Sequence, residues 1–207
     1  MRRLASLPTL AVALRIMGLQ QATASPLVRR YTLDEFFALD APPGGGYYEL
    51  IAGVLYMVPP PTGPHHIAAS RLVSIFAAYT SAQPDRCMLF VPRAPIWTPA
   101  DTYLEPDLFL VSAERLKTMD AGRLTTADLV VEILSPGSAM YDRTAKADTY
   151  AALGIAELWL VDLESRSIEQ RVLHDGAWET IGTFGGAAPM TAQTFPGLAV
   201  TPAAIFP

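Results

Sequence analysis

Two apolar runs of strand length, each carrying one acidic residue, constrain the fold of this chain most. They are PDLFLVS at 106–112 and DLVVEILS at 128–135, rich in Val, Leu, Ile and Phe with little polar alternation. Runs of this kind are typical of strands covered on both faces, so we expect both at the centre of a sheet. Because an unpaired buried charge is costly, Asp107 and Glu132 must have partners in the fold.

The remaining pattern predicts helices and strands around this centre. Thr32 and Glu35 have capping-box spacing, which marks the start of a short helix within 31–39. We further expect a hairpin over 47–59 turning at Ala52-Gly53, a helix over 65–79, an edge or bent strand over 87–97, a helix over 139–153, a buried strand over 156–163 and a terminal hairpin turning at Asp175-Gly176. This order predicts an α/β or α+β fold with a mixed central β-sheet flanked by helices.

The length of 207 residues favours one domain, which we assign to 31–207. Residues 1–30 read differently, because Arg2 and Arg3, the apolar stretch LASLPTLAVAL and the small residues ATAS resemble the charged, apolar and small-residue parts of a signal peptide. Arg15 shortens the apolar stretch, so we favour a poorly ordered N-terminal extension over a signal peptide.

Composition narrows the classes of partner. Hydrophobic residues make up 51% of the chain, yet no uninterrupted apolar run reaches membrane-spanning length, so we expect no membrane span. The net charge of −5 argues against broad nonspecific adhesion to nucleic acid, although a local basic site stays open. Cys87 is the single cysteine, which excludes an intrachain disulfide, fits the cytoplasm and suggests a packing role.

Four charged residues stand where the pattern alone would not put them: Glu49, Asp107, Glu132 and Lys146. Carboxylates brought together inside a fold repel each other unless a cation neutralises them, so a bound divalent metal explains the three acids best. Oxygen ligands favour Mg²⁺ or Mn²⁺, and the three histidines and one cysteine lack the spacing of a zinc site.

A lysine beside such a metal points to phosphodiester chemistry. Mg²⁺ held by few carboxylates typically completes its shell with waters and a substrate phosphate. The Lys146 ammonium would stabilise charge on the phosphoryl oxygens or assist a metal-bound water. Asp142 lies four residues earlier on the same helical face and would orient Lys146, while Arg143 is placed to reach a phosphate.

Each assignment has a plainer alternative. Asp107 and Glu132 would also serve as structural acids at strand ends, and Glu49 would equally well face solvent on the first hairpin. A lysine on a surface helix is more often solvated than catalytic. His65 and His66, at the start of a helix, either contact a phosphate or transfer a proton, or are ordinary polar residues.

The succession of motifs resembles a known family. The motifs are YYELIAGVLYMVPPP, a helix that opens with histidine, LEPDLFLV, LVVEILSPGS and DRTAKADTYAALGIAELWLVD, and together they extend over about residues 31–200. They resemble the Uma family of restriction endonucleases, within the PD-(D/E)xK nuclease superfamily. The resemblance implies a restriction-endonuclease-like core, with a sheet of about four strands flanked by helices, and Mg²⁺-dependent cleavage of DNA.

The resemblance also assigns residues by position. Asp107 matches the acid of the PD half-motif and Glu132 the acid of the second half. Leu134 stands where the ExK form would have lysine, and the implied substitute is Lys146 on the following helix, whose long side chain would reach the same site. Glu49 resembles the additional acid that the N-terminal part of such folds supplies.

Two functions follow as hypotheses. The first is an endonuclease in which Asp107, Glu132 and Glu49 bind Mg²⁺ or Mn²⁺ and Lys146 assists attack on a DNA phosphodiester. The second is a nuclease fold kept as a catalytically inactive binding or interaction module, which the acidic net charge favours. A homodimer is expected in the first case, because cutting both strands of a duplex calls for two sites related by symmetry.

Overall fold

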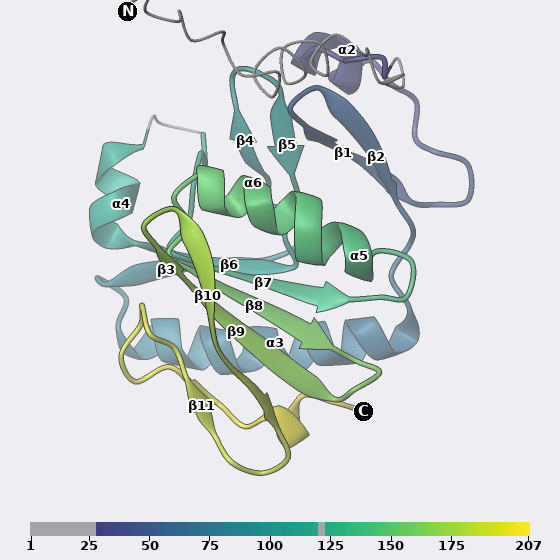
Figure 1. Ribbon diagram of the computed structural model, residues 1–207. Coiled ribbons are helices and arrows are strands. Elements are labelled where there is room, and N and C mark those ends of the chain that lie inside the picture. The colour runs from purple at the N-terminus through teal and green to yellow at the C-terminus, as the bar shows by residue number, and fades with distance from the viewer. Residues whose placement is uncertain (1–27, 120–122) are drawn as a thin grey trace, which may run out of the picture.

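The computed structural model describes residues 28–119 and 123–207 (Figure 1). The predicted extension over 1–30 therefore lies outside the described residues except for 28–30. The helices are α2 (Leu33–Phe37), α3 (Gly63–Ala82), α4 (Ala113–Thr118), α5 (Ala139–Tyr141), the π-helical turn η1 (Asp142–Lys146), α6 (Ala147–Ala152) and the 3₁₀ turn η2 (Pro202–Ala204). The strands are β1 (Tyr47–Ile51), β2 (Val54–Val58), β3 (Cys87–Phe90), β4 (Ile96–Thr98), β5 (Thr102–Leu104), β6 (Leu108–Ser112), β7 (Leu129–Leu134), β8 (Glu157–Asp162), β9 (Ser167–His174), β10 (Ala177–Gly185), β11 (Met190–Thr191) and β12 (Ala199–Val200).

The two acid-bearing runs form strands β6 and β7 inside a six-stranded sheet of order β10-β9-β8-β7-β6-β3. Strands β7 and β8 are parallel and the other neighbours are antiparallel, which confirms the predicted mixed sheet. All six residues of β7 are buried, as the continuous apolar pattern requires. The sheet has more than the four strands that the resemblance implied, because β9 and β10 extend it at one edge beyond β8, β7, β6 and β3.

Helices cover both faces of this sheet (Figure 1). Helix α3 contributes Ala68, Leu72 and Phe76 to a core on one face, where the Phe76 ring packs edge-on against Trp159 with centroids 5.6 Å apart. The segment α5-η1-α6 lies on the opposite face, where Ala147 and Tyr150 join a second core. Cys87 is buried in the first core, which confirms its predicted packing role.

The N-terminal hairpin turns where the sequence predicts, since Ala52 and Gly53 both have positive φ (47° and 77°). Positive φ at both central residues is the conformation of a type I′ turn, which matches the twist of the two strands of a hairpin. The hairpin belongs to a separate four-stranded antiparallel sheet of order β2-β1-β5-β4. The run over 87–97, which carries Pro92 and Pro95, is divided between the two sheets: β3 forms an edge of the central sheet and β4 an edge of the small one.

The helix predicted over 139–153 is interrupted. Between the short helices α5 and α6, residues Asp142–Lys146 form a π-helical turn, with backbone bonds spanning five residues instead of four. Gly154 follows the helix with φ of 71°, in the left-handed conformation that commonly ends helices. The predicted helix is therefore present, but residues Asp142–Lys146 form a turn that is wider than that of an α-helix.

The C-terminal part of the chain is held to the sheet by the buried carboxylate of Glu157. Glu157, at the start of β8, is fully buried and accepts bonds from Trp159 Nε1 (2.7 Å) and Gln170 Nε2 (2.6 Å). Its other oxygen accepts the backbone N–H groups of Gln193 and Thr194 (2.9 and 2.8 Å) and the Thr194 hydroxyl (2.7 Å). In the described part of the chain, no helix has the length and apolar character needed to cross a membrane.

Candidate active site

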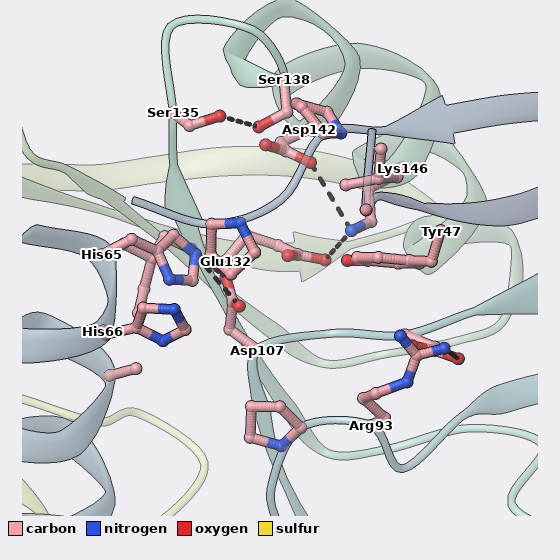
Figure 2. A pocket seen from close by; sticks show the side chains of 18 residues that line it. Tyr47, His65, His66, Arg93, Asp107, Glu132, Ser135, Ser138, Asp142 and Lys146 are labelled. Atoms are coloured by element: carbon pink, nitrogen blue, oxygen red, sulfur yellow. Dashed lines mark hydrogen bonds and ion pairs between the residues drawn. The ribbon is translucent and has the colours of Figure 1, made fainter. Parts of the chain in front are cut away.

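Asp107 and Glu132 meet at one end of the β6-β7 pair. Leu108 pairs with Val131 in antiparallel register, so the next step of the ladder sets Asp107 beside Glu132. Both side chains line one cavity of about 270 Å³. Figure 2 shows His65 and His66 on one side of this cavity and Lys146 and Tyr47 on the other. The two predicted acids thus share a pocket that opens at the edge of the core.

The Asp107 carboxylate is held by two donors. Oδ2 accepts the backbone N–H of Ile133 at 2.7 Å, and His65 Nε2 lies 3.2 Å from each carboxylate oxygen. His65 is buried in the first turn of α3, and its Nδ1 has no hydrogen-bond partner among the described residues. These contacts fix the direction of the carboxylate while its exposed edge faces the cavity.

The Glu132 carboxylate is almost fully buried and strongly bonded. Oε1 lies 2.8 Å from the ammonium of Lys146 and accepts the Tyr150 hydroxyl at 2.5 Å. Burial raises the pKa of Glu132 well above its usual range, against the lowering effect of Lys146. The acid in the middle of an apolar strand is therefore stabilised by an ion pair inside the fold.

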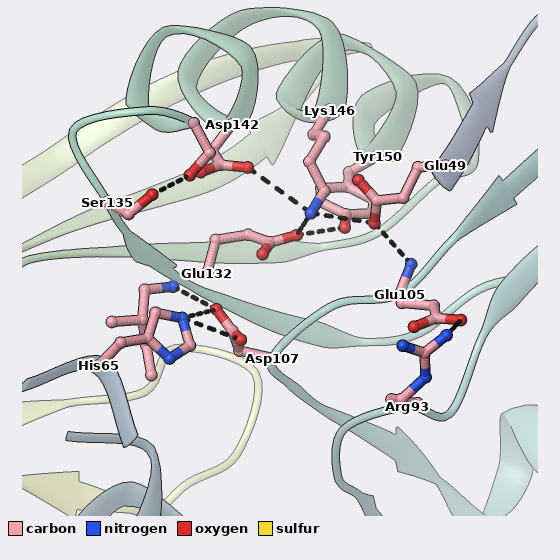
Figure 3. A network of polar contacts seen from close by, with 12 residues as sticks. Glu49, His65, Arg93, Glu105, Asp107, Glu132, Ser135, Asp142, Lys146 and Tyr150 are labelled. Atoms are coloured by element: carbon pink, nitrogen blue, oxygen red, sulfur yellow. Dashed lines mark hydrogen bonds and ion pairs between the residues drawn. The ribbon is translucent and has the colours of Figure 1, made fainter. Parts of the chain in front are cut away.

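Lys146 lies at the centre of a buried network, which Figure 3 shows. Its ammonium is 3.3 Å from Glu49 Oε1 and 3.6 Å from Asp142 Oδ1, in addition to the bond to Glu132. Burial alone would lower the pKa of Lys146, but the carboxylates of Glu132 and Glu49 raise it well above its ordinary value. Lys146 therefore keeps its proton and its charge in a site that water hardly reaches.

Glu49 occupies the far side of Lys146 from the cavity. It is fully buried on β1, its Oε1 accepts the backbone N–H of Glu105 at 2.8 Å, and it is not among the residues that line the pocket. Burial raises the pKa of Glu49, while Lys146 and the Glu105 amide lower it. In this arrangement Glu49 holds the lysine, so its predicted role as a metal ligand has no geometric support here.

The donor set suits a hard cation in part. Among residues 28–119 and 123–207, no group of three or more His, Cys, Asp or Glu side chains is arranged to bind a metal ion. Asp107 and Glu132 nevertheless present carboxylate oxygens to one cavity. Mg²⁺ is commonly held by one or two carboxylates, with waters and substrate phosphate completing its shell, so this pair fits such an ion chemically.

Other expectations fare unevenly. Asp142 contacts Lys146, as its spacing predicts, whereas Arg143 is engaged by Asp162 (3.1 Å) and Glu169 (2.5 Å) and is not directed at the pocket. Sequence reasoning did not single out Arg93 or Glu105, both of which line the cavity. Glu105 stands two residues before Asp107 in LEPD, so a second acid in the same motif was the available signal.

Comparison with known proteins places this chain in a family. The family model Uma2, described as "Putative restriction endonuclease", matches residues 33–203. The chain belongs to the Uma2 family. A comparison with curated proteins found no match.

A solved structure supports the fold of this Uma2 chain. The crystal structure of "a putative nuclease belonging to DUF820" from Anabaena variabilis ATCC 29413 superposes with a TM-score of 0.68. The two chains are 21% identical over 85% of this chain and 97% of the other. At that identity the likeness shows a shared fold, so the Uma2 chain has the nuclease-like α/β fold that its motifs predict.

Proposed function

We propose that this chain is a metal-dependent endonuclease that hydrolyses DNA phosphodiester bonds. The observation that carries the proposal is the convergence of Asp107 and Glu132 on one cavity, with the Lys146 ammonium 2.8 Å from Glu132. Asp107 and Glu132 would hold Mg²⁺ or Mn²⁺. A bound ion of this kind supplies a Lewis acid for the phosphoryl oxygen and lowers the pKa of a coordinated water.

The residues of the chain divide the remaining work. Ile133 N–H and His65 orient the Asp107 carboxylate toward the cavity. Lys146 supplies a fixed positive charge beside the position of the scissile phosphate, where charge develops on the phosphoryl oxygens. Glu49 and Asp142 hold that ammonium in place before substrate arrives, so little reorganisation is needed during the reaction.

The partner and assembly follow from the chemistry proposed. The substrate is DNA, and a homodimer would bring two pockets to the two strands of a duplex. The buried free thiol of Cys87 suits a reducing compartment, which favours the cytoplasm.

A second candidate is a binding module without turnover. This candidate is favoured because the Lys146 ammonium is already surrounded by three carboxylates in the described structure and has little charge left to offer a phosphate. It is also favoured by the lack of any three-ligand metal group within the same described residues. In that case the network would serve to stabilise the fold, and the pocket would bind without reacting.

Plasmid nicking and calorimetry together test the proposal. Supercoiled DNA is incubated with the protein and Mg²⁺, Mn²⁺ or EDTA, and each metal is titrated into the protein in parallel. We expect metal-dependent nicking that is lost in Asp107→Asn and Glu132→Gln, with matched loss of metal binding. Asp175→Asn changes an exposed turn acid and serves as the control. Nicking that survives both site substitutions, or no metal binding by the intact protein, would contradict the proposal.

A further inference from the structure

A second cavity lies directly beside the proposed active site. It has a volume of about 340 Å³ and is bounded by α2, the segment that follows it, and strands β1 and β5. Tyr47, Arg93 and Glu105 line both cavities and form their common wall. Because the two cavities share a wall, a DNA strand with one phosphate in the first cavity could place a neighbouring nucleotide in the second cavity.

Aromatic rings form one wall of the second cavity. Phe36 and Phe37 of α2 approach Tyr103 of β5 with ring centroids 5.0 and 5.5 Å apart. All three rings line the cavity, and Phe37 is 57% exposed although it is a large apolar side chain. Exposed aromatic faces beside a phosphate site are the usual platform on which nucleic-acid bases stack.

The common wall carries a charged pair. Arg93 Nη2 lies 3.2 Å from Glu105 Oε1, and its guanidinium lies 5.0 Å from the centre of the Tyr47 ring. The Arg93 side chain is 65% exposed, whereas that of Glu105 is only 6% exposed. Arg93 thus presents donors to solvent at the boundary between the two cavities, where a backbone phosphate would lie. Figure 3 shows this pair beside the Lys146 network.

Glu105 also offers an unused acceptor. Its Oε2 is buried and forms no hydrogen bond of 3.5 Å or less among the described residues, and the Tyr103 hydroxyl is the neighbouring donor with which a ligand N–H would compete. A buried acceptor without a donor is costly, and a ligand N–H would remove that cost. The exocyclic amino groups of cytosine, adenine and guanine are donors of the right kind, and glutamate accepts from the cytosine amino group in known complexes.

We propose that the second cavity binds one unstacked nucleobase of the substrate strand, next to the phosphate that is cut. The base stacks on Phe37 and its neighbours, its amino group donates to Glu105, and Arg93 contacts the intervening phosphate. The inference rests on the proposed function and deepens it, because a base can enter only when it is unpaired. The preferred substrate is therefore single-stranded or locally unpaired DNA.

Binding without cleavage tests this directly. Fluorescein-labelled twelve-nucleotide strands are titrated with the full chain in Ca²⁺ and followed by anisotropy: oligodeoxycytidine, oligothymidine, an abasic strand, and a duplex of the first with its complement. We expect oligodeoxycytidine to bind about 5- to 150-fold more tightly than the abasic strand, the range for loss of base stacking. Phe37→Ala should reduce binding of oligodeoxycytidine to the abasic level. Met88→Ala removes an exposed apolar side chain on β3, outside both cavities, and should change nothing.

Glu105→Gln probes the amino-group contact. We expect this variant to lose the preference for oligodeoxycytidine over oligothymidine while still binding both strands better than the abasic one. Equal affinity of intact protein and Phe37→Ala for oligodeoxycytidine would overturn the inference, as would equal binding of the abasic strand.

The two proposals fail separately. Base-dependent binding without any Mg²⁺-dependent cutting would leave the base site standing and refute the nuclease. Cutting of duplex and single strands at equal rates, unaffected by Phe37→Ala, would leave the nuclease standing and refute the base site.

Discussion

His65 Nε2 lies 3.2 Å from both carboxylate oxygens of Asp107, and this contact joins α3 to the strand pair that carries the two acids. A histidine that holds a ligating carboxylate in one orientation acts through that carboxylate, so His65 is a positioning residue in the proposed site. Its sequence context, at the start of a helix, gave no sign of this partner.

We predict that His65→Ala weakens Mn²⁺ affinity and DNA nicking about 10- to 100-fold, the usual effect of losing an outer-shell partner of a metal ligand. His65→Gln, which keeps a donor at that position, should recover part of the loss. His174→Ala removes an exposed histidine from β9 and is the matched control. Calorimetric Mn²⁺ titrations check the affinity, and an unchanged affinity in His65→Ala would contradict the assigned role.

Removal of the buried ammonium should destabilise the fold. Lys146→Met leaves Glu132 and Glu49 buried without their cation, which we expect to lower the free energy of unfolding by about 3–5 kcal/mol at pH 8. Urea unfolding measures the change. Lys117→Met, which removes an exposed partner of Glu114, should change stability by less than about 1 kcal/mol. Equal losses in the two variants would contradict this account.

The same variant should acquire a distinct pH dependence. Burial already raises the pKa of Glu132 and of Glu49, and without Lys146 nothing nearby lowers them as strongly. A carboxyl whose pKa is raised in the folded state stabilises the fold below its unfolded pKa and loses that contribution as pH rises. Unfolding of Lys146→Met at pH 5 and pH 8 should therefore show a smaller deficit relative to wild type at pH 5. A deficit independent of pH would contradict the prediction.

Glu157 should contribute to stability and not to activity. Glu157→Gln places an amide where Oε1 and Oε2 together accept five hydrogen bonds, so at least one buried donor loses its acceptor. We expect a loss of roughly 2–4 kcal/mol from such unsatisfied groups, with nicking unchanged per folded molecule. Thermal and urea unfolding measure the loss, and Glu179→Gln on exposed β10 is the control. A selective loss of nicking with full stability would contradict the structural role.

Acid should weaken the ion pair between Asp162 of β8 and Arg143 of η1. Burial is the largest single influence and raises the pKa of Asp162, but the hydrogen bonds from Ser165 and Glu164 together with the charge of Arg143 outweigh it and lower the pKa overall. A carboxyl with a lowered folded pKa stabilises the fold above its unfolded pKa, and this contribution is lost as pH falls through the folded value. Asp162→Asn should therefore cost about 1 kcal/mol at pH 7 and less at pH 2, as measured by urea unfolding. A cost that grows at pH 2 would contradict the prediction.

Local pattern was sufficient for most elements of the fold. Strands β6 and β7 follow from continuous apolar runs, the first hairpin from Ala52-Gly53, and α2 from the Thr32–Glu35 capping box, which is formed by both reciprocal bonds. Asp162 accepts the N–H of Ser165 at 3.1 Å, as a turn-capping aspartate should. These features depend on neighbours in the chain, which a sequence displays directly.

Features that depend on distant pairing could not be predicted in the same way. The Lys146 network joins β1, β7 and η1, and the contact between Glu49 and the Glu105 amide joins β1 to the residue that follows β5. The sequence nominated these acids but not the lysine-holding role of Glu49. The sequence likewise did not show which sheet each half of the 87–97 run would join, because a proline predicts a break in a strand but not the strand that pairs with either half.

Glu157 shows why a buried acid in an apolar strand is an ambiguous signal. It stands in AELWLVDL much as Glu132 stands in LVVEILS, and both are almost fully buried. Glu132 lines a cavity and meets a cation, whereas Glu157 is surrounded by amide and hydroxyl donors. The two acids differ in the groups that surround them, and those groups come from remote parts of the chain.

The π-helical turn at Asp142–Lys146 has a consequence for how related sequences are matched. Each residue of an α-helix advances by about 100° around the axis, so one extra residue in a wide turn shifts everything after it to a different face. A relative whose helix lacks the wide turn needs a one-residue gap within 142–146 for its lysine to align with Lys146. Without that gap, an alignment would match Lys146 to a neighbour and score an intact site as a missing one.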